Sequence, residues 1–175
     1  ARYLEELNVE SRVEKTELGK LIFDVRKEKN PCSLCANLRR GILNSVAIEN
    51  GCNKVALGHH CDDVIETLLL SLFYEGNIHT FSPVTYLSRS NIHLIRPMIY
   101  IEEHDVEKWI RKNNLEPISK CCSIDGYTKR EDMKNLIKSF SKNIPHIKAN
   151  LFGAVKRSNI NGWEQIKGNE VENEK

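Results

Sequence analysis

The sequence lacks three features that would mark a membrane, secreted or zinc-ribbon protein. No apolar run approaches the about 20 residues that a membrane-spanning helix needs. No segment with the pattern of a secretory signal precedes the first charged residues. The six cysteines do not form the two well-spaced pairs of a four-cysteine zinc site. We therefore expect a cytoplasmic protein with no membrane partner, whose cysteines serve a metal or redox centre rather than disulfides.

The cysteines nevertheless show an informative spacing. Cys32 and Cys35 lie three residues apart at the start of a predicted helix, and Cys121 and Cys122 are adjacent far downstream. Thiols at C-x-x-C spacing can bind one soft metal centre, and a distant third thiol can complete the site. Because adjacent cysteines rarely supply two ligands to one ion, the count favours three protein ligands and one open coordination position. We expect Cys52 to be a buried, unreactive thiol.

The composition is that of an ordinary globular protein with one basic region. The 175 residues are 40% hydrophobic and 29% charged, which suits one domain or part of a larger one. The net charge of +2 hides the stretch 120–157, which holds nine Lys and Arg against three Asp and Glu. Such a stretch fits a polyanion such as RNA, and it fits a solvated helix face equally well.

Hydrophobic periodicity predicts an α/β fold. A helix over 32–50, a buried strand over 54–58 and a helix over 62–74 give the alternation of a doubly wound parallel sheet. The other expected elements are helices over 2–8, 102–113, 128–142 and 144–157, a strand over 10–18, a strand or extended pair over 80–87 and 92–98, and a polar tail beyond 159. Two helices have expected inward faces, formed by Val106, Trp109 and Ile110 in one and by Met133, Leu136, Ile137 and Phe140, after the N-cap Thr128, in the other.

Polar side chains gather where the 54–58 strand ends and the next helix begins. Residues 58–66 include His59, His60, Asp62, Asp63 and Glu66. Ligands bind at this carboxyl edge in open α/β sheets, so the cluster could hold magnesium beside phosphates or position a nucleotide. Asp62 is the expected N-cap. The helix dipole alone also favours acidic residues in a first turn, and both interpretations stand at this point.

Three arginines are weaker candidates. Arg39 and Arg40 follow the C-x-x-C pair by one to two helical turns, where they could contact a substrate phosphate or simply be solvated. Arg96 precedes Pro97 at the end of an extended apolar run. Its guanidinium could form an ion pair or a phosphate contact.

Four motifs, in order, resemble one known family. They are P-C-S-L-C at 31–35, L-R-R-G at 38–41, G-H-H-C-D-D at 58–63 followed by Glu66-Thr67, and I-R-P at 95–97. Together they look like the tRNA 2-thiocytidine synthetase group of the PP-loop ATP pyrophosphatases, over about residues 3–157. The G-H-x-x-D-D segment alone is shared with other PP-loop enzymes, such as lysidine synthetases. The C-x-x-C pair argues against assigning this chain to the lysidine synthetases.

The resemblance implies a Rossmann-like fold of the adenine nucleotide alpha hydrolase type and an ATP-dependent tRNA sulfurtransferase. Such enzymes adenylate a cytidine in the tRNA anticodon loop and let sulfur displace AMP, using ATP, Mg²⁺ and a 4Fe-4S cluster. The partners implied are tRNA, a sulfur donor protein of the cysteine desulfurase type and a possible second copy of the chain. By residue, the resemblance assigns the cluster to Cys32, Cys35 and Cys122 (with Cys121 as the alternative), the nucleotide to Gly58, His59, Asp62 and Asp63, catalysis to Asp62 and Asp63, and tRNA contacts to Arg39, Arg40, Lys129 and Arg130.

One family motif is missing. The phosphate-binding S-G-G-x-D-S loop occurs nowhere in the 175 residues, and Gly41, Gly51 and Gly58 are isolated. We therefore expect a PP-loop-type domain over 1–118 without its first strand and loop, a basic helical segment over 119–158 and a flexible tail over 159–175. On this expectation the chain starts after the loop or descends from a truncated, inactive homologue, and alone it hydrolyses ATP weakly or not at all.

A second class of function also fits the residues. Cys32, Cys35 and Cys122 could hold a structural zinc ion in a non-catalytic zinc- or RNA-binding module.

Overall fold

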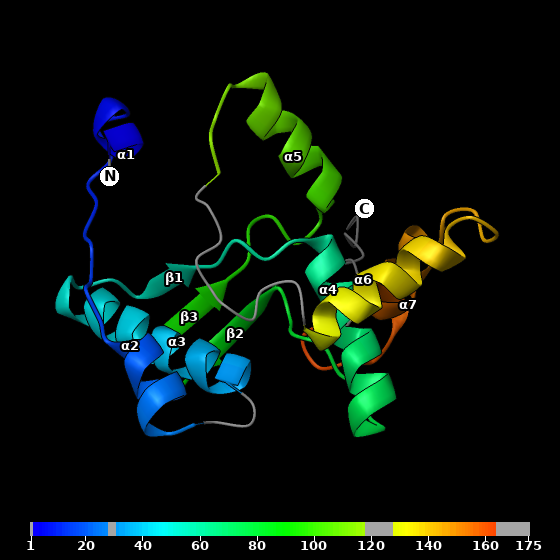
Figure 1. Cartoon of the computed structure of the whole chain (residues 1–175), viewed down its shortest axis with the longest axis horizontal. Helices are drawn as coiled ribbons and strands as arrows, with labels where there is room; N and C mark the ends of the chain where they lie inside the picture. Colours follow the sequence, from blue (N-terminus) through cyan, green and yellow to red (C-terminus); the bar gives the residue numbers. More distant parts are fainter. Residues whose placement is uncertain (1, 28–30, 118–127, 164–175) are drawn as a thin grey trace, which may run out of the picture. The chain divides into compact units, whose positions relative to one another are not determined.

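The computed structural model describes residues 2–27, 31–117 and 128–163 (Figure 1). The chain divides into two compact units, residues 1–52 and 53–175. Within the described residues, no helix has both the length and the apolar character needed to cross a membrane.

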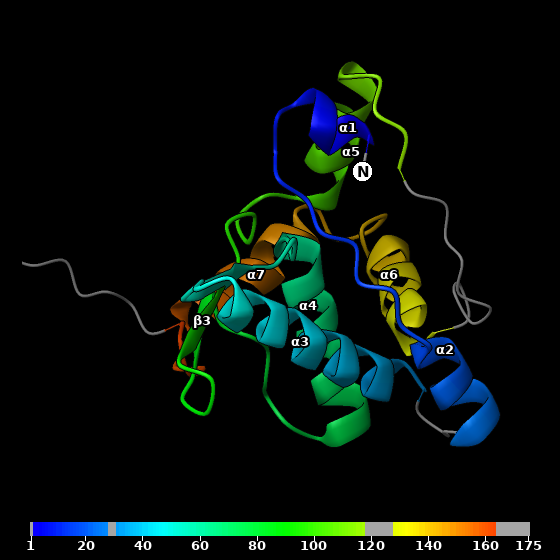
Figure 2. The ribbon, with the colours of Figure 1, turned by 90° about the vertical axis from the view of Figure 1, so that its left-hand side faces the viewer.

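The first unit is helical. It contains α1 (Arg2–Glu6), α2 (Leu18–Lys20), the π-helical turn η1 (Leu21–Val25) and α3 (Pro31–Glu49). Both α2 and η1 pack against α3 (Figure 2). The predicted 32–50 helix is confirmed, and Gly51, with φ at +68°, ends it in the left-handed conformation that glycine adopts without strain.

The predicted strand over 10–18 is wrong. Residues 9–17 have no regular structure, and the side chains of residues 10–17 are exposed. An alternating pattern forms a strand only when a neighbouring strand accepts its hydrogen bonds, and the described part of the first unit contains no strand. Arg12 instead pairs with Glu14 and, at 3.1 Å, with Glu49 of α3.

The second unit contains a three-stranded sheet. Its strands are β1 (Lys54–Ala56), β2 (Val84–Leu87) and β3 (Ile92–Ile95), in the order β1-β3-β2. β1 pairs with β3 in parallel and β2 pairs with β3 antiparallel. The sheet is therefore mixed, because the short 88–91 turn can join only antiparallel neighbours, whereas α4 lies on the long connection between the parallel pair.

Helices complete the described part of the second unit (Figure 1). They are α4 (Cys61–Leu70), which continues as the π-helical turn η2 (Ser71–Glu75), α5 (Glu103–Lys112), α6 (Lys129–Phe140) and α7 (Ile147–Arg157). The apolar side of α4 packs against α6 and α7. The buried cluster comprises Val64, Ile65, Leu68 and Leu69 of α4 with Ile99, Met133, Ile137, Phe152, Val155 and Trp163.

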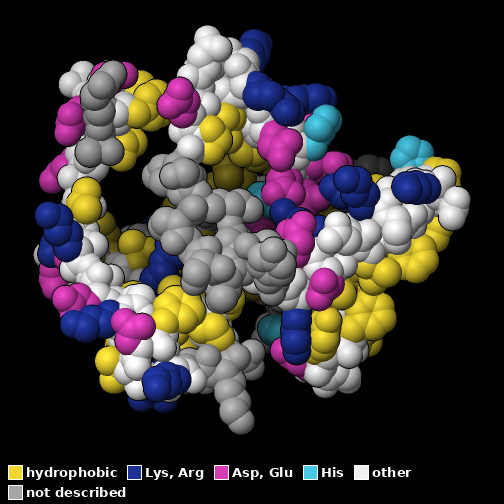
Figure 3. Space-filling model, viewed as in Figure 1, with side chains coloured by type: hydrophobic (Ala, Val, Ile, Leu, Met, Phe, Trp, Pro, Cys, Tyr) yellow, Lys and Arg dark blue, Asp and Glu magenta, His cyan; other side chains and the backbone are white. Residues whose placement is uncertain are grey.

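Two expected inward residues face solvent instead. Trp109 is 57% exposed because only one side of α5 is covered. Val106 and Ile110 lie on the covered side and are half-buried. Phe140 is exposed at the end of α6, whereas Met133 and Ile137 lie in the core as predicted. Figure 3 shows hydrophobic side chains on the molecular surface over α6. Phe73 and Tyr74 of η2 are also exposed.

The chain folds back after α7. The indole N–H of Trp163 donates a hydrogen bond to the carbonyl oxygen of Phe81, at 3.0 Å. Gly162 precedes it with φ at +82°, and a Cβ at this position would collide with Ser82. Trp163 also packs edge-on against Phe152. This contact joins the end of the described chain to the segment that leads into β2.

Replacing Ile65 tests the assignment of the core. Its side chain is fully buried, so Ile65→Ala should lower the free energy of unfolding by about 2–5 kcal/mol. Ile78→Ala, at a 67% exposed position, should change it by less than about 0.5 kcal/mol. Urea unfolding followed by tryptophan fluorescence reports on the second unit, which contains both tryptophans, and equal effects of the two variants would contradict the assignment.

The cysteines offer a second test. Cys61 is buried, and this burial, with the charge of Asp62, raises the pKa of its thiol to about 12. Cys52 is exposed, so the prediction of a buried thiol there is wrong, since its turn lies at the surface. Iodoacetamide at pH 8 should modify Cys52 in the folded protein and spare Cys61 until the chain is unfolded, as read by peptide mass spectrometry. Rapid native modification of Cys61 would contradict its burial.

Candidate functional site

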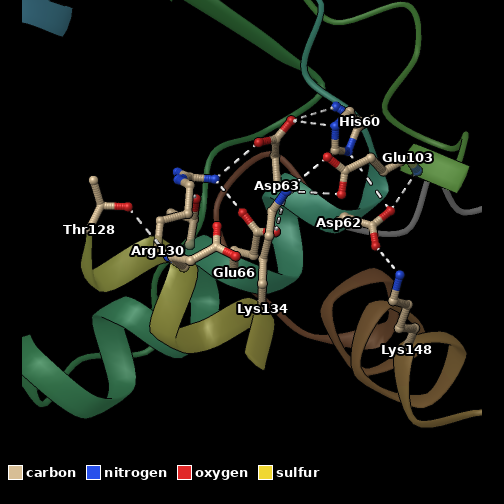
Figure 4. Close-up of polar contacts among 11 residues, drawn as sticks. His60, Asp62, Asp63, Glu66, Glu103, Thr128, Arg130, Lys134 and Lys148 are labelled. Carbon is tan, nitrogen blue, oxygen red and sulfur yellow. Dashed lines mark hydrogen bonds and ion pairs between the residues drawn. The ribbon is translucent and has the colours of Figure 1, made fainter. Parts of the chain in front are cut away.

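The candidate site is the N-terminus of α4, at the carboxyl end of β1 (Figure 4). After Ala56 the chain turns, and the amide of Leu57 still donates to the carbonyl oxygen of Ile95 in the neighbouring strand, at 2.9 Å. The amide of Cys61 donates to the carbonyl oxygen of Ile101, also at 2.9 Å. These two bonds fix the 58–60 turn against the β3 side of the sheet, where open α/β sheets bind ligands.

Asp63 caps this helix from inside its first turn. His60 is the N-cap residue, and its amide donates to Asp63 Oδ2 at 3.0 Å. Asp63 Oδ1 accepts a hydrogen bond from Arg130 Nη1, also at 3.0 Å. The prediction that Asp62 is the N-cap is therefore wrong, because the N-cap lies two residues earlier, at His60, and the side chain of Asp62 has other partners.

Asp62 is an almost fully buried carboxylate, 4% exposed. Its Oδ2 accepts a hydrogen bond from the amide of Glu103 at 2.7 Å, and its Oδ1 pairs closely with Lys148 of α7. Burial alone would raise the pKa of Asp62, but the Glu103 amide and the Lys148 ammonium favour the charged form. The result is a pKa below the ordinary aspartate value.

Glu66 is still more buried, at 1% exposed. Arg130 Nη1 lies 2.8 Å from its Oε2, and Lys134 Nζ lies 3.9 Å from its Oε1. Burial raises the pKa of Glu66 above its usual range, although both cations oppose the shift. Lys134 also reaches Glu103 at 2.8 Å, and the net effect of these carboxylates is a raised pKa for Lys134 despite its partial burial.

The charges at this helix end nearly balance. Three cations, Arg130, Lys134 and Lys148, face four carboxylates, Asp62, Asp63, Glu66 and Glu103. In the part of the chain that the structure describes, no three His, Cys, Asp or Glu side chains are placed to hold a metal ion together.

The other predicted nucleotide residues line the same turn. The ring of His59 packs against Phe81, with centroids 4.8 Å apart, and its buried Nδ1 has no hydrogen-bond partner among the described residues. Burial lowers the pKa of His59, so the neutral imidazole is favoured. A side chain at Gly58 would meet only Met98, at an ordinary contact distance.

Arg96 has an internal role in the fold. Its Nη1 donates to the carbonyl oxygen of Ser82 at 2.6 Å and to Thr85 Oγ1 at 3.1 Å, and the guanidinium lies over the ring of Phe81. The side chain is buried, so it braces the segment before β2.

The cysteine pair lies in the first unit. Cys32 is exposed and Cys35 half-buried, on successive turns at the start of α3. Residues three apart on a helix face the same side, so both thiols can reach one metal centre. Cys121 and Cys122 lie outside the described residues.

The four residues predicted to contact tRNA differ in their surroundings. Arg39 is exposed, and the exposed Arg40 contacts Asn37 and the carbonyl oxygen of Ala36 on its own helix. Lys129 lies 4.0 Å above the ring of Tyr74. Arg130 alone points toward the acidic cluster, and its contact with RNA stays a prediction.

Sequence reasoning missed Lys134, Lys148 and Glu103. Lys134 had a detectable signal, because it lies four residues after Arg130 and therefore on the same face of α6. Lys148 had none, because it meets Asp62 across 86 positions of sequence.

Comparison with known proteins gives this site its context. The tRNA-cytidine(32) 2-sulfurtransferase of Syntrophotalea carbinolica is 40% identical over 156 residues, which cover 87% of this chain and 60% of that protein. The protein of the same name from Paraburkholderia phymatum is 38% identical over 87% of this chain and 46% of its own length. The chain thus spans about half to three fifths of these relatives.

A solved structure is also similar. The U34-tRNA thiolase NcsA from Methanococcus maripaludis, determined with its [4Fe-4S] cluster, superimposes with a TM-score of 0.68 at 25% identity. The match covers 87% of this chain and 52% of that one.

These findings confirm the predicted α/β fold of the adenine nucleotide alpha hydrolase type and the resemblance to tRNA 2-thiocytidine synthetases. The PP-loop domain family matches residues 2–143, most of the sequence. The chain therefore belongs to the PP-loop domain family.

Proposed function

We propose that the chain is part of an ATP-dependent tRNA sulfurtransferase that thiolates a cytidine of the anticodon loop. The observation that carries this proposal is the Cys32–Cys35 pair on the first turns of α3, in a chain whose relatives are named tRNA-cytidine(32) 2-sulfurtransferases. Since the chain belongs to the PP-loop domain family, the N-terminus of α4 would supply the nucleotide side of the site.

The chemistry requires two steps, an activation by ATP and a substitution by sulfur. The uncharged cytidine carbonyl is a poor electrophile, so its oxygen first attacks the α-phosphate of ATP and expels pyrophosphate. Sulfur then attacks the carbon of the former carbonyl group, and AMP leaves with the oxygen. ATP is thus consumed to make a leaving group, and a sulfur donor protein of the cysteine desulfurase type would supply the sulfur in the cytoplasm.

The cysteines fit an iron–sulfur cluster. Thiolates are the ligands that iron–sulfur clusters use, and Cys32 and Cys35 present two on one side of a helix start. Cys122, or its neighbour Cys121, would be the third ligand. A cluster held by three cysteines leaves one iron open to carry sulfur.

Magnesium fits less well. Each carboxylate oxygen of Asp62 and Asp63 already accepts a hydrogen bond from another group of the protein. The pair therefore does not offer an open set of metal ligands in this arrangement. We therefore assign Gly58, His59 and the two aspartates to shaping the nucleotide side. Arg39, Arg40 and Lys129, which are exposed cations, would contact the tRNA backbone, and a second copy of the chain could join the complex.

Cluster assembly tests the metal assignment. Anaerobic reconstitution with iron and sulfide should give the broad visible absorption of an iron–sulfur cluster, and Cys35→Ser should lose it together with most of the bound iron. Cys52→Ser is the matched control at another accessible thiol and should keep the absorption. A colourless protein with one tightly bound zinc would instead favour the non-catalytic zinc- or RNA-binding module.

Salt-dependent RNA binding tests the arginines of α3. Replacing both Arg39 and Arg40 with alanine should weaken binding to unmodified tRNA and reduce the slope of log affinity against log salt by up to about 2. Arg111→Ala serves as control, since that side chain pairs with Glu107 on the exposed face of α5, 3.6 Å away. An unchanged slope in filter-binding titrations would rule out phosphate contacts by these two residues.

A further inference from the structure

Arg130 contacts three side chains along one face of α4, of which Figure 4 labels Asp63 and Glu66. Besides Asp63 and Glu66, its guanidinium reaches Thr67, whose Oγ1 lies 3.3 Å from Nη2. These partners lie on successive turns of α4, so a single side chain of α6 spans the beginning of the helix. A phosphate could approach Arg130 only in competition with two carboxylates.

Each oxygen of Asp63 has a distinct partner. Oδ1 accepts from Arg130, and Oδ2 accepts from the amide of His60, both at 3.0 Å. The plane of a carboxylate is fixed when both oxygens are engaged. Because His60 is the N-cap residue, the orientation of Asp63 determines how the 58–60 turn enters α4.

Asp62 is arranged in the same way with different partners. Lys148 holds Oδ1, and Oδ2 accepts from the amide of Glu103 at the start of α5. Lys148 lies on α7, outside residues 2–143 that match the PP-loop family. Each aspartate of the motif therefore joins one cation from a C-terminal helix to one backbone amide.

We propose that Arg130 and Lys148 are positioning residues for the two aspartates of the nucleotide motif. Arg130 orients Asp63 so that its second oxygen holds the His60 amide, and Lys148 orients Asp62 so that its second oxygen holds the Glu103 amide. The inference deepens the proposed function and rests on it for the role of the α4 N-terminus. It assigns Arg130 to this motif in place of the tRNA contact expected from the sequence.

Amide hydrogen exchange with crossed variants tests the proposal. In the full chain, Arg130→Met should speed exchange of the His60 amide about five- to tenfold and leave Glu103 unchanged. Lys148→Met should do the reverse. Arg130→Lys, which keeps the charge, should restore part of the protection of His60. Arg111→Met, at the exposed pair on α5, should alter neither amide.

The possible results separate the two roles. If Arg130 only ties α6 to α4, Arg130→Met will lower the melting temperature and affect both amides alike or neither, which would overturn the proposal. Calorimetric titration with ATP and magnesium adds a functional readout, for which we expect about fivefold weaker binding in Arg130→Met and partial rescue in Arg130→Lys. Unaltered ATP binding by Arg130→Met would also count against the proposal. Because the 175 residues lack the S-G-G-x-D-S loop, failure of the unsubstituted chain to bind ATP would leave the decision on the positioning role to the crossed exchange pattern, while cluster assembly tests the proposed function separately.

Discussion

The second unit is organised by the need to neutralise carboxylates buried on a largely apolar helix. Asp62 and Glu66 lie on α4 among Val64, Ile65 and Leu68, nearly out of contact with water. Removing one partner from a buried ion pair typically costs about 3–5 kcal/mol, because the other charge is left without compensation. The start of α5, the first two turns of α6 and the first turn of α7 each bring a partner to this helix. Apolar packing holds α6 and α7 against α4, and the charges determine their register along it.

The sequence predicted the elements whose signals are local. The helix over 32–50 and the strand and helix around the G-H-H-C-D-D motif were correct because strong periodicity and a glycine stop define them. The 10–18 strand failed because alternation says nothing about whether a pairing strand exists. The direction of β2 follows from the length of its turn rather than from its composition.

The long-range ion pairs could not be predicted from the sequence. Arg130 meets α4 across more than 60 positions, and its place in a basic stretch favoured an RNA contact instead. A basic residue near a helix start has the same sequence signature whether its partner is a phosphate or a buried carboxylate. Only the fold distinguishes the two. The cysteines behaved differently, because C-x-x-C spacing on a helix start already defines which side the thiols face.

The thiols differ in their ability to serve as metal ligands. A ligand thiolate must lose its proton, and Cys61, beside Asp62 and away from water, keeps its proton at physiological pH. Cys32 and Cys35 are accessible to solvent at the start of α3. Proximity of Cys61 to the acidic motif therefore does not make it a candidate for iron binding.

The return of the chain after α7 has a consequence for recognising distant relatives. At Gly162 both the backbone angle and the nearness of Ser82 exclude any side chain, and the next residue, Trp163, fills the core and holds the carbonyl oxygen of Phe81. A Gly-Trp pair that follows the last helix thus reports a physical constraint on the fold, independent of metal, nucleotide or RNA. Because it lies past residue 143, where the PP-loop match ends, it could separate chains that share this C-terminal packing from those that share only the motifs of the PP-loop match.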